Sequence, residues 1–302
     1  MRRGGGRKPS IPEVAAESGA SSPQLDRAEL APDSLAPEQV RRRLGGRFGR
    51  PYRYVEECAS TQLLLLGSEL PEGAVAVAEY QTAGRGRRGR SWVAPAGSSI
   101  LVSILLRPPP ARRAPELSLV SALAVAAAIE SETGAAALVK WPNDVLVAGR
   151  KVAGILAELA EGAVVVGIGV NVRQTEDELP LDAPTPAGSL RTVASVMPGR
   201  ATLLAAILAE LERRYERWRE EGLVPLSAEI EARDALRGRV VRVGDVEAIA
   251  RRILPDGRLE VELQDGGRRV LDGGEVRLVL VGPSGEETQP RSIPATRPDR
   301  RG

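Results

Sequence analysis

The segment GRGRRGR at residues 84–90 is the first of several whose residue types could carry chemistry. It holds four arginines and three glycines. Glycines let backbone N–H groups approach an anion closely, and guanidiniums pair with phosphate or carboxylate oxygens. The segment matches neither a Walker loop nor a dinucleotide-binding GxGxxG. Composition alone therefore leaves two interpretations open: an anion-binding loop, or a flexible loop that contacts RNA.

Lysine and asparagine are scarce in this chain, and their positions mark two further segments. The residues of these two types are Lys8, Lys140, Lys151, Asn143 and Asn171. Arginine cannot replace lysine where a compact ammonium is needed, so a retained lysine indicates a chemical role. Residues 140–144 read KWPND and residues 150–154 read RKVAG. Taken alone, the first is also an ordinary β-turn sequence and the second an ordinary hairpin edge.

Small and polar residues mark two more places. GIGVN at 167–171 has glycines that allow close approach to a ligand in a sheet, and it ends on an amide. Ser60, Thr61 and Gln62 place hydroxyls and an amide at the start of a predicted helix. Packing needs explain the glycines equally well, and a plain helix cap explains the Ser-Thr pair.

Composition excludes several classes of site. The chain has no histidine and one cysteine, Cys58. This excludes Ser-His-Asp and Cys-His triads, HExxH zinc sites and internal disulfides, and it suits a reducing cytoplasm. The net charge of +2 gives no global basic field. No apolar run indicates a membrane span or a secretory signal. Electrostatic stabilisation and positioning are therefore the expected chemistry.

The elements that must position these segments follow from periodicity and turn residues. Ser34 is expected to cap a short helix, and Ser60 or Thr61 another through Leu66. Longer helices are expected at 117–134, 203–222 and 225–236. Expected strands are 52–57, 73–80, 100–107, 137–141, a hairpin at 145–159, and 163–172. Short alternating strands at 239–281 predict a small barrel or meander. The expected fold class is α+β, with a mixed or antiparallel sheet flanked by helices, followed by this small β unit.

Composition also predicts four regions along the chain. Residues 1–33 and 283–302 are rich in Gly, Pro and Ser and carry no periodicity, so both are expected to be disordered tails. The folded part is expected to comprise a catalytic domain at 34–236 and a β domain at 237–282.

The four segments GRGRRGR, KWPND, RKVAG and GIGVN, in this order and before a small β domain, resemble the biotin–protein ligase family. The resemblance covers about residues 34–282. It implies a class II synthetase-like catalytic domain and an SH3-like C-terminal barrel. It also implies the short, ligase-only form, because some 33 unpatterned residues precede the catalytic start where other members carry a DNA-binding domain.

The resemblance implies two half-reactions. Biotin and ATP give biotinyl-5′-AMP and pyrophosphate, and a lysine of the biotin carboxyl carrier protein of a carboxylase then takes the biotin. The cofactor and partner expectations are ATP and biotin as substrates, Mg²⁺ with ATP, the carrier protein, no DNA, no membrane, and a monomer or homodimer in the cytoplasm. Metal ligands cannot be named from the sequence.

The resemblance also assigns roles by position. Residues expected to act in catalysis are Lys151, Arg87, Lys140 and Asp144. Residues expected to bind biotin are Ser60, Thr61, Gln62, Gln81, Arg85, Gly86, Arg87, Lys151 and Gly154. Residues expected to bind ATP or the adenylate are Arg87, Arg90, Trp92, Asn143, Gly169 and Asn171. Gln62 stands where the family has asparagine and is one methylene longer.

Two alternatives are considered beside this hypothesis. A lipoate–protein ligase of related fold would use a similar pocket, and titration with biotin against lipoate separates the two. An RNA-binding protein would need aromatic residues interleaved with the basic ones. The chain has a single Phe, and Trp92 is the one aromatic residue near the Gly/Arg segment (residues 84–90).

Overall fold

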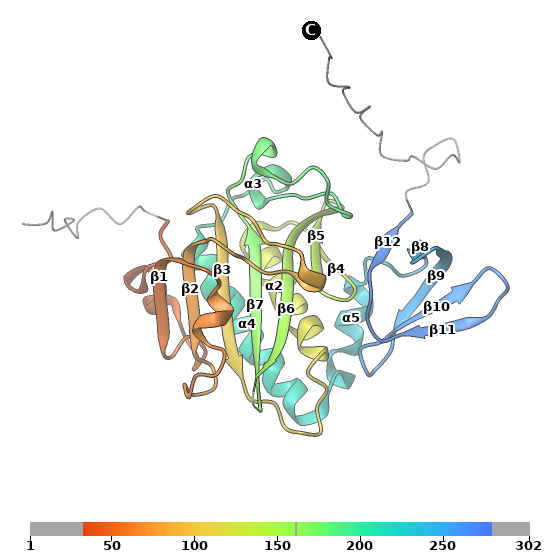
Figure 1. The fold of residues 1–302 in the computed structure, drawn as a ribbon, viewed down its shortest axis with the longest axis horizontal. Helices are drawn as coiled ribbons and strands as arrows, with labels where there is room; N and C mark the ends of the chain where they lie inside the picture. Colours follow the sequence, from red (N-terminus) through yellow and green to blue (C-terminus); the bar gives the residue numbers. More distant parts are fainter. Residues whose placement is uncertain (1–32, 161, 280–302) are drawn as a thin grey trace, which may run out of the picture. The chain divides into compact units, whose positions relative to one another are not determined.

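The computed structural model describes residues 33–160 and 162–279 (Figure 1). The two predicted tails lie outside these ranges except for Asp33, which is buried. The described part therefore begins one residue before the predicted boundary. The last three residues of the predicted β domain, 280–282, also lie outside it. The internal boundary near residue 237 stays a prediction.

A seven-stranded mixed sheet forms the centre of the described chain (Figure 1). Its strands, in spatial order, are β1 (Tyr52–Cys58), β2 (Val75–Gln81), β3 (Ser99–Leu106), β7 (Ala163–Asn171), β6 (Arg150–Ala160), β5 (Asp144–Val147) and β4 (Ala137–Lys140). β1 and β2 are parallel, and every other neighbouring pair is antiparallel. The predicted strands and the hairpin turn at Ala148–Gly149 are confirmed.

Two long helices, α2 (Glu116–Thr133) and α4 (Arg200–Glu221), lie against one face of this sheet (Figure 1). Alanine, valine and leucine fill α2 and are buried on nearly all sides, because the helix lies between the sheet and α4. Gly134 ends α2 in the left-handed conformation, at φ 70°, as its predicted role requires. The apolar residues of α4 point into the same core. The helices leave the opposite face of the sheet free for the chemistry-bearing segments.

The shorter helices differ from the sequence expectations. They are α1 (Pro37–Val40), η1 (Arg41–Arg43), η2 (Thr61–Leu64), η3 (Arg87–Gly89), η4 (Glu176–Glu178), α3 (Leu190–Val193), η5 (Val224–Leu226) and α5 (Ser227–Arg233), where η marks a 3₁₀ helix. The cap predicted at Ser34 is wrong: Ala36 is the N-cap of α1, and the Ser34 hydroxyl donates to Glu79 and accepts from the Ala36 N–H. The helix predicted from Ser60 is the 3₁₀ turn η2, without a side-chain cap.

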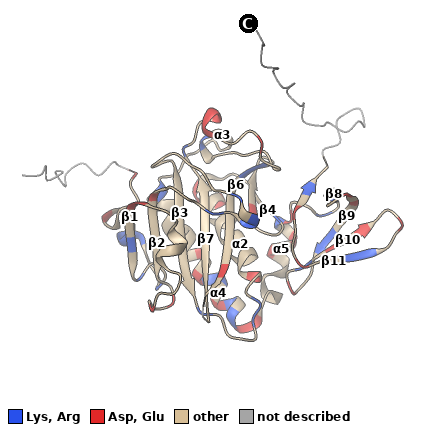
Figure 2. Ribbon diagram, in the orientation of Figure 1, with Lys and Arg blue, Asp and Glu red and all other residues tan. Residues whose placement is uncertain are grey.

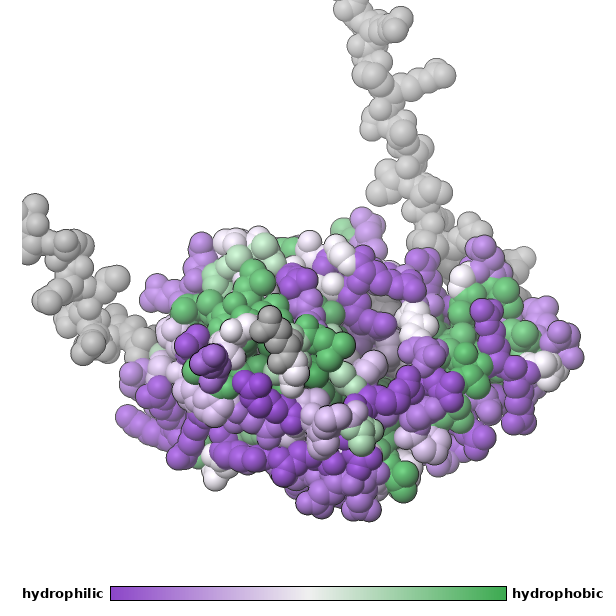
Figure 3. Space-filling model, turned by 60° about the horizontal axis from the view of Figure 1, so that its bottom comes forward, coloured by the Kyte–Doolittle hydropathy of each residue, from purple (hydrophilic) through white to green (hydrophobic). Residues whose placement is uncertain are grey.

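The C-terminal strands form a second, antiparallel sheet. Its spatial order is β11 (Arg268–Leu271), β10 (Leu259–Leu263), β9 (Val246–Ile253), β8 (Val240–Val243) and β12 (Val276–Leu278). Trp141 is fully buried, and its indole N–H donates to the carbonyl of Gly257, 2.9 Å away. The KWPND turn is therefore fixed against this sheet. The hydrophobic residues visible in Figure 3 form separate green patches, one of them on the second sheet at right.

Candidate active site

One row of residues crosses the free face of the main sheet. Lys140 pairs with Asp144, Asp144 with Gly154, Gly154 with Gly169, and Gly169 with Leu101. Directly paired residues in antiparallel strands point to the same face. The row therefore brings KWPND, RKVAG and GIGVN together, with two glycines forming an open floor between the charged end and β3.

The charged end of this row is built on Asp144. The Lys151 ammonium lies 2.7 Å from the Asp144 carboxylate, with the two side chains 26% and 14% exposed. Lys140 is buried on the neighbouring strand. Burial lowers the pKa of Lys140; Asp144 opposes this shift, and the nearby charge of Lys151 adds to it. Two lysines thus share one carboxylate, which leaves positive charge available to an anionic ligand.

The Gly/Arg segment folds over this charged end. Its ends are tied by backbone hydrogen bonds, from Gly86 N–H to the Arg90 carbonyl at 2.7 Å and from Trp92 N–H to the Gly84 carbonyl at 2.9 Å. Arg87 donates to the Asn143 side-chain oxygen at 3.2 Å. Burial, followed by the charge of a neighbouring arginine, lowers the pKa of Arg87, but a guanidinium remains charged at neutral pH.

Other arginines of the segment are tied to two different parts of the chain. Arg85 makes two contacts with Glu158 on β6, at 2.7 and 2.9 Å. Arg90 contacts Glu275, just before β12 in the second sheet. Figure 2 shows the resulting concentration of blue residues on the loop that crosses in front of the main sheet. These ion pairs hold the segment against the protein, whereas an RNA-contacting loop would leave its guanidiniums free.

The far end of the free face is uncharged and polar. Ser60, Thr61 and Gln62 are all buried. Gln81 accepts hydrogen bonds from the Thr61 backbone N–H at 2.7 Å and from its hydroxyl at 3.0 Å. Gln62 donates to the Leu156 carbonyl at 3.1 Å. This end offers hydroxyl and amide groups without a formal charge, which suits a neutral polar ring.

Gln62 and Gly167 fit one another closely. A Cβ added to Gly167 would lie 3.0 Å from the Gln62 side-chain carbonyl carbon. The longer arm of glutamine therefore reaches across β7 and bonds to β6. Glycine at 167 leaves the room that this side chain occupies.

Trp92 lies on the glycine floor. A Cβ on Gly169 would lie 2.5 Å from the indole, and one on Gly154 would lie 3.0 Å from it. The Lys151 ammonium is 5.8 Å from the ring centroid, which is cation–π range. The indole N–H is buried and has no hydrogen-bond partner within residues 33–160 and 162–279. A buried indole N–H usually finds an acceptor, so a ligand oxygen would complete this site.

The side chain of Asn171 makes two hydrogen bonds within the protein. Its amide donates to the Gly188 carbonyl at 3.0 Å, and its oxygen accepts from Gln174 at 2.9 Å. Asn171 lines the cavity, but its polar atoms are engaged with protein. These bonds support a neighbouring loop, and the contact of Asn171 with ATP or the adenylate stays a prediction.

All of the predicted site residues line one cavity of about 690 Å³. That volume falls within the roughly 300–1,000 Å³ typical of small-molecule sites. Sequence reasoning missed two parts of the wall, the loop at 180–187 and residues 274–277 of the second sheet. Proline and small residues in the first and glycine in the second gave no signal beyond that of a loop or turn.

A protein-held metal does not fit the described residues. Within residues 33–160 and 162–279, no group of three or more Asp, Glu or Cys side chains is placed to hold a metal ion. Of the described helices, none is both long and apolar enough to cross a bilayer. The cavity can offset negative charge at one end and hydrogen-bond a neutral polar group at the other.

Comparison with known proteins gives a consistent result. Residues 55–174 match the model of the biotin/lipoate A/B protein ligase family. The chain is 41% identical over 214 residues to the biotin–[acetyl-CoA-carboxylase] ligase of Mycobacterium tuberculosis, covering 66% of this chain and 76% of that protein. It is 38% identical over 188 residues to the bifunctional ligase/repressor BirA of Bacillus spizizenii, covering 59% of this chain. It spans only 58% of that relative's length.

The fold is also found among solved structures. The biotin protein ligase of Aquifex aeolicus, in complex with biotin and ATP, superimposes with a TM-score of 0.67 and 29% sequence identity. The match covers 74% of this chain and 97% of that one. The mixed α/β architecture with its second sheet is therefore the architecture of these ligase structures.

Proposed function

The chain belongs to the family of biotin–protein ligases, and from this premise we propose that it joins biotin to a protein lysine at the expense of ATP. The acceptor would be the biotin carboxyl carrier protein of a carboxylase, as the name of the Mycobacterium relative indicates for that protein. One observation carries the proposal. The residues predicted for biotin, for ATP and for catalysis come from separate segments and line a single cavity.

In the first step, a carboxylate oxygen of biotin forms a bond to the α-phosphorus of ATP. The bond from that phosphorus to the β-phosphate oxygen breaks, and pyrophosphate leaves. Two anions must approach, so fixed positive charge has to offset their repulsion and stabilise the charge on phosphorus in the transition state. Lys151, Arg87 and Lys140 surround the charged end of the cavity and would supply it.

Asp144 would act on this step through Lys151. Its carboxylate lies 2.7 Å from the Lys151 ammonium and holds it at the edge of the glycine floor. In the second step, the amine nitrogen of the acceptor lysine attacks the acyl carbon, the bond to the phosphate oxygen breaks, and AMP leaves. The amine gives up one proton, and Asp144 is the nearest carboxylate in the row to receive it.

The uncharged end would bind the ureido ring. Gln62 and Gln81 direct amide groups there, and Ser60 and Thr61 add hydroxyls. Arg85, Gly86 and Gly154 would complete the biotin side. Trp92 would cover the acyl chain and the adenylate and keep water from the mixed anhydride, which must not hydrolyse before transfer.

The ATP side would include Arg90, Asn143, Gly169 and Asn171. Because the described residues offer no acidic cluster, we propose that Mg²⁺ enters with the ATP phosphates. An SH3-like closure of the second sheet and a cytoplasmic location are further proposals; the single cysteine, Cys58, supports a reducing compartment. For the oligomeric state, both a monomer and a homodimer are consistent with the proposal.

One experiment tests the function directly. The protein is incubated with Mg²⁺, ATP labelled at the α-phosphate, and biotin or lipoate in parallel. We expect pyrophosphate release that depends on biotin, and a labelled adenylate that stays with the protein until carrier domain is added. Equal or greater activity with lipoate would assign the chain to the lipoate branch, and pyrophosphate release without either acid would contradict the proposal.

A further inference from the structure

A loop at residues 174–189, here called the strap, forms one wall of the cavity. It leaves the sheet after β7 and returns at Ser189, the residue before α3. The Ser189 hydroxyl donates to the Gln174 carbonyl at 2.6 Å, so the two ends of the strap are joined. Residues 180–185, in its middle, line the cavity. The placement of the strap therefore sets the shape of that wall.

The strap also holds the backbone of the catalytic lysine. Lys151 N–H donates to the Pro186 carbonyl at 2.7 Å, and Gly188 N–H donates to the Lys151 carbonyl at 2.9 Å. These two bonds extend the sheet by a short parallel pairing beside β6. Asn171 fixes the same stretch by donating to the Gly188 carbonyl at 3.0 Å. A displaced strap would release Lys151 from both backbone partners.

Gln174 lies at the base of this arrangement and is 1% exposed. Its amide nitrogen donates to the Ser99 hydroxyl at 2.6 Å and to the Asn171 side-chain oxygen at 2.9 Å. Because Asn171 must present its oxygen to Gln174, its nitrogen faces Gly188. The Gln174 side-chain oxygen is buried without a hydrogen-bond partner in the described part of the chain. A buried oxygen without a partner lowers the stability of the fold. The favourable interactions of the Gln174 side chain are therefore the two hydrogen bonds that its nitrogen donates.

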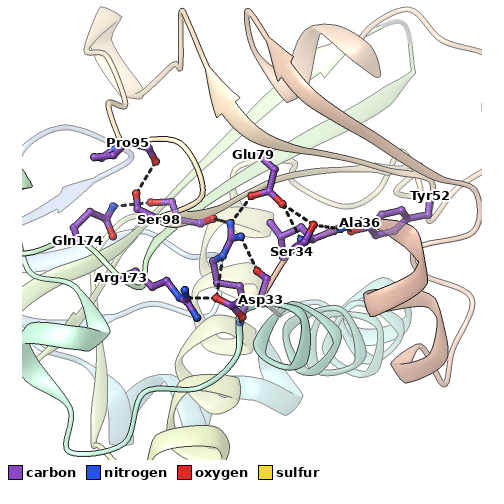
Figure 4. Close-up of polar contacts among 12 residues, drawn as sticks. Asp33, Ser34, Ala36, Tyr52, Glu79, Pro95, Ser98, Arg173 and Gln174 are labelled. Carbon is purple, nitrogen blue, oxygen red and sulfur yellow. Dashed lines mark hydrogen bonds and ion pairs between the residues drawn. The ribbon is translucent and has the colours of Figure 1, made fainter. Parts of the chain in front are cut away.

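The frame behind Gln174 is rigid. Arg173 pairs with Asp33 at 2.6 Å, and Arg200 donates to the Ser99 carbonyl at 3.0 Å and to Asp33. Figure 4 shows Asp33 beside Arg173, with Gln174 reaching toward the chain at Ser98. An ion cluster centred on the buried Asp33 and Arg200 thus anchors both the residue before Gln174 and the residue to which Gln174 donates.

We propose that Gln174 is a positioning residue for the ligase reaction: it orients Asn171, which fixes the strap and through it Lys151. The inference rests on the proposed function. Gln174 does not line the cavity and would touch neither substrate. Its effect should fall on the end of the cavity near Asn171. Gly167, four residues earlier on β7, lies beneath Gln62 at the biotin end and should be unaffected.

The test compares Gln174→Leu with Thr133→Val in the full chain. Thr133 is also buried, and its hydroxyl also makes two hydrogen bonds, but at the end of α2. Hydrogen exchange and steady-state kinetics are measured for both. For Gln174→Leu we expect about tenfold faster exchange across residues 175–188 and about tenfold lower kcat/KM for ATP, on the scale of one buried hydrogen-bonding group. For Thr133→Val we expect neither change.

Two further variants test the same chain of contacts. If Gln174→Leu fails to fold, Ser99→Ala removes only the acceptor of one bond and should give a smaller change in the same direction. Combining Gln174→Leu with Asn171→Ala should add little to either single change, because both break the same chain of contacts. Unchanged strap exchange, or fully additive kinetic losses, overturns the positioning role. Wild-type protein that makes no adenylate overturns the function instead, while exchange still tests the strap.

Discussion

Removing the Lys151 ammonium should slow adenylate formation more than any other single change in the cavity. Lys151→Met keeps the length and the apolar stem but deletes the charge that lies 2.7 Å from Asp144 and 5.8 Å from the Trp92 ring. Loss of one preorganised electrostatic group raises an activation barrier by about 2–4 kcal/mol, or roughly 30- to 1,000-fold in rate. We expect a decrease in this range.

A second contribution arises from Asp144. With a side chain only 14% exposed, its carboxylate would then lie beside the reacting anions without its ammonium partner. That charge repels the phosphate, so the loss should lie toward the upper end of the range. Adding Asp144→Asn to Lys151→Met removes the repulsion and should recover about tenfold of the rate, which corresponds to 1.4 kcal/mol of coupling between the neighbouring residues. If the two residues acted independently, the rate of the double variant would instead fall by the product of the two single decreases.

The assay is single-turnover pyrophosphate release at saturating biotin and ATP, so that binding does not mask the chemical step. Lys140→Met is the matched control, because it deletes the other ammonium of the cavity while leaving the ion pair of Asp144 intact. Its loss should be smaller. Adenylate formation by Lys151→Met at the wild-type rate would refute the assignment, and so would a larger loss in the control.

Three further predictions concern the floor, the second sheet and the N-terminal anchor. Gly169→Ala places a methyl group 2.5 Å from the Trp92 indole and should weaken ATP binding about tenfold by calorimetry, whereas Gly45→Ala, with open space around it, should not. Burial opposes ionisation of Glu275, but its arginine partners lower its pKa. The ionised Glu275 therefore stabilises the folded protein above the unfolded pKa of about 4.3, and this contribution is lost as pH falls through the lower folded pKa. The difference in unfolding free energy in urea between Glu275→Gln and wild type should shrink on acidification. Asp33→Asn removes one of the two carboxylates that pair with the buried Arg200 guanidinium, while Glu79 remains. It should reduce the unfolding free energy in urea by about 2 kcal/mol, the scale of hydrogen bonds to charged groups, and a loss below about 1 kcal/mol would contradict a structural role for that pair.

The elements of the main sheet could be predicted from sequence because each carries a local signal. Residues 163–170 are an unbroken apolar run. The hairpin turn has glycine at one of its two positive-φ positions, Gly149, while Ala148 takes the other at φ 49°. The start of the chain was harder. Ser34 has the right residue type for a helix cap, but a distant carboxylate, Glu79, competes for its hydroxyl. Local propensity cannot report such a tertiary partner.

The site was predictable where unusual residues mark it. Lys140, Lys151 and Asn143 stood out by their scarcity, and the Gly/Arg segment by its composition. The strap was missed because its contribution is made by backbone groups. Pro186 and Gly188 bind Lys151 through a carbonyl and an N–H that any residue type could provide. Contacts of that kind depend on register in the folded chain and leave no trace in residue identity.

The arrangement of charge is consistent with the two proposed half-reactions taking place in one cavity of a chain without histidine. Three cations of the cavity are held by partners on different parts of the chain: Lys151 by Asp144 on β5, Arg85 by Glu158 on β6, and Arg90 by Glu275, just before β12 of the second sheet. Pairing fixes the side chains before substrate arrives, so little reorganisation is needed when charge develops on phosphate. Because those partners lie on the main sheet and on the second sheet, the Gly/Arg segment can take its place only when both are folded and in contact. Glu275, just before β12 of the second sheet, also lines the cavity, so we expect substitutions there to alter adenylation without touching the glycine floor.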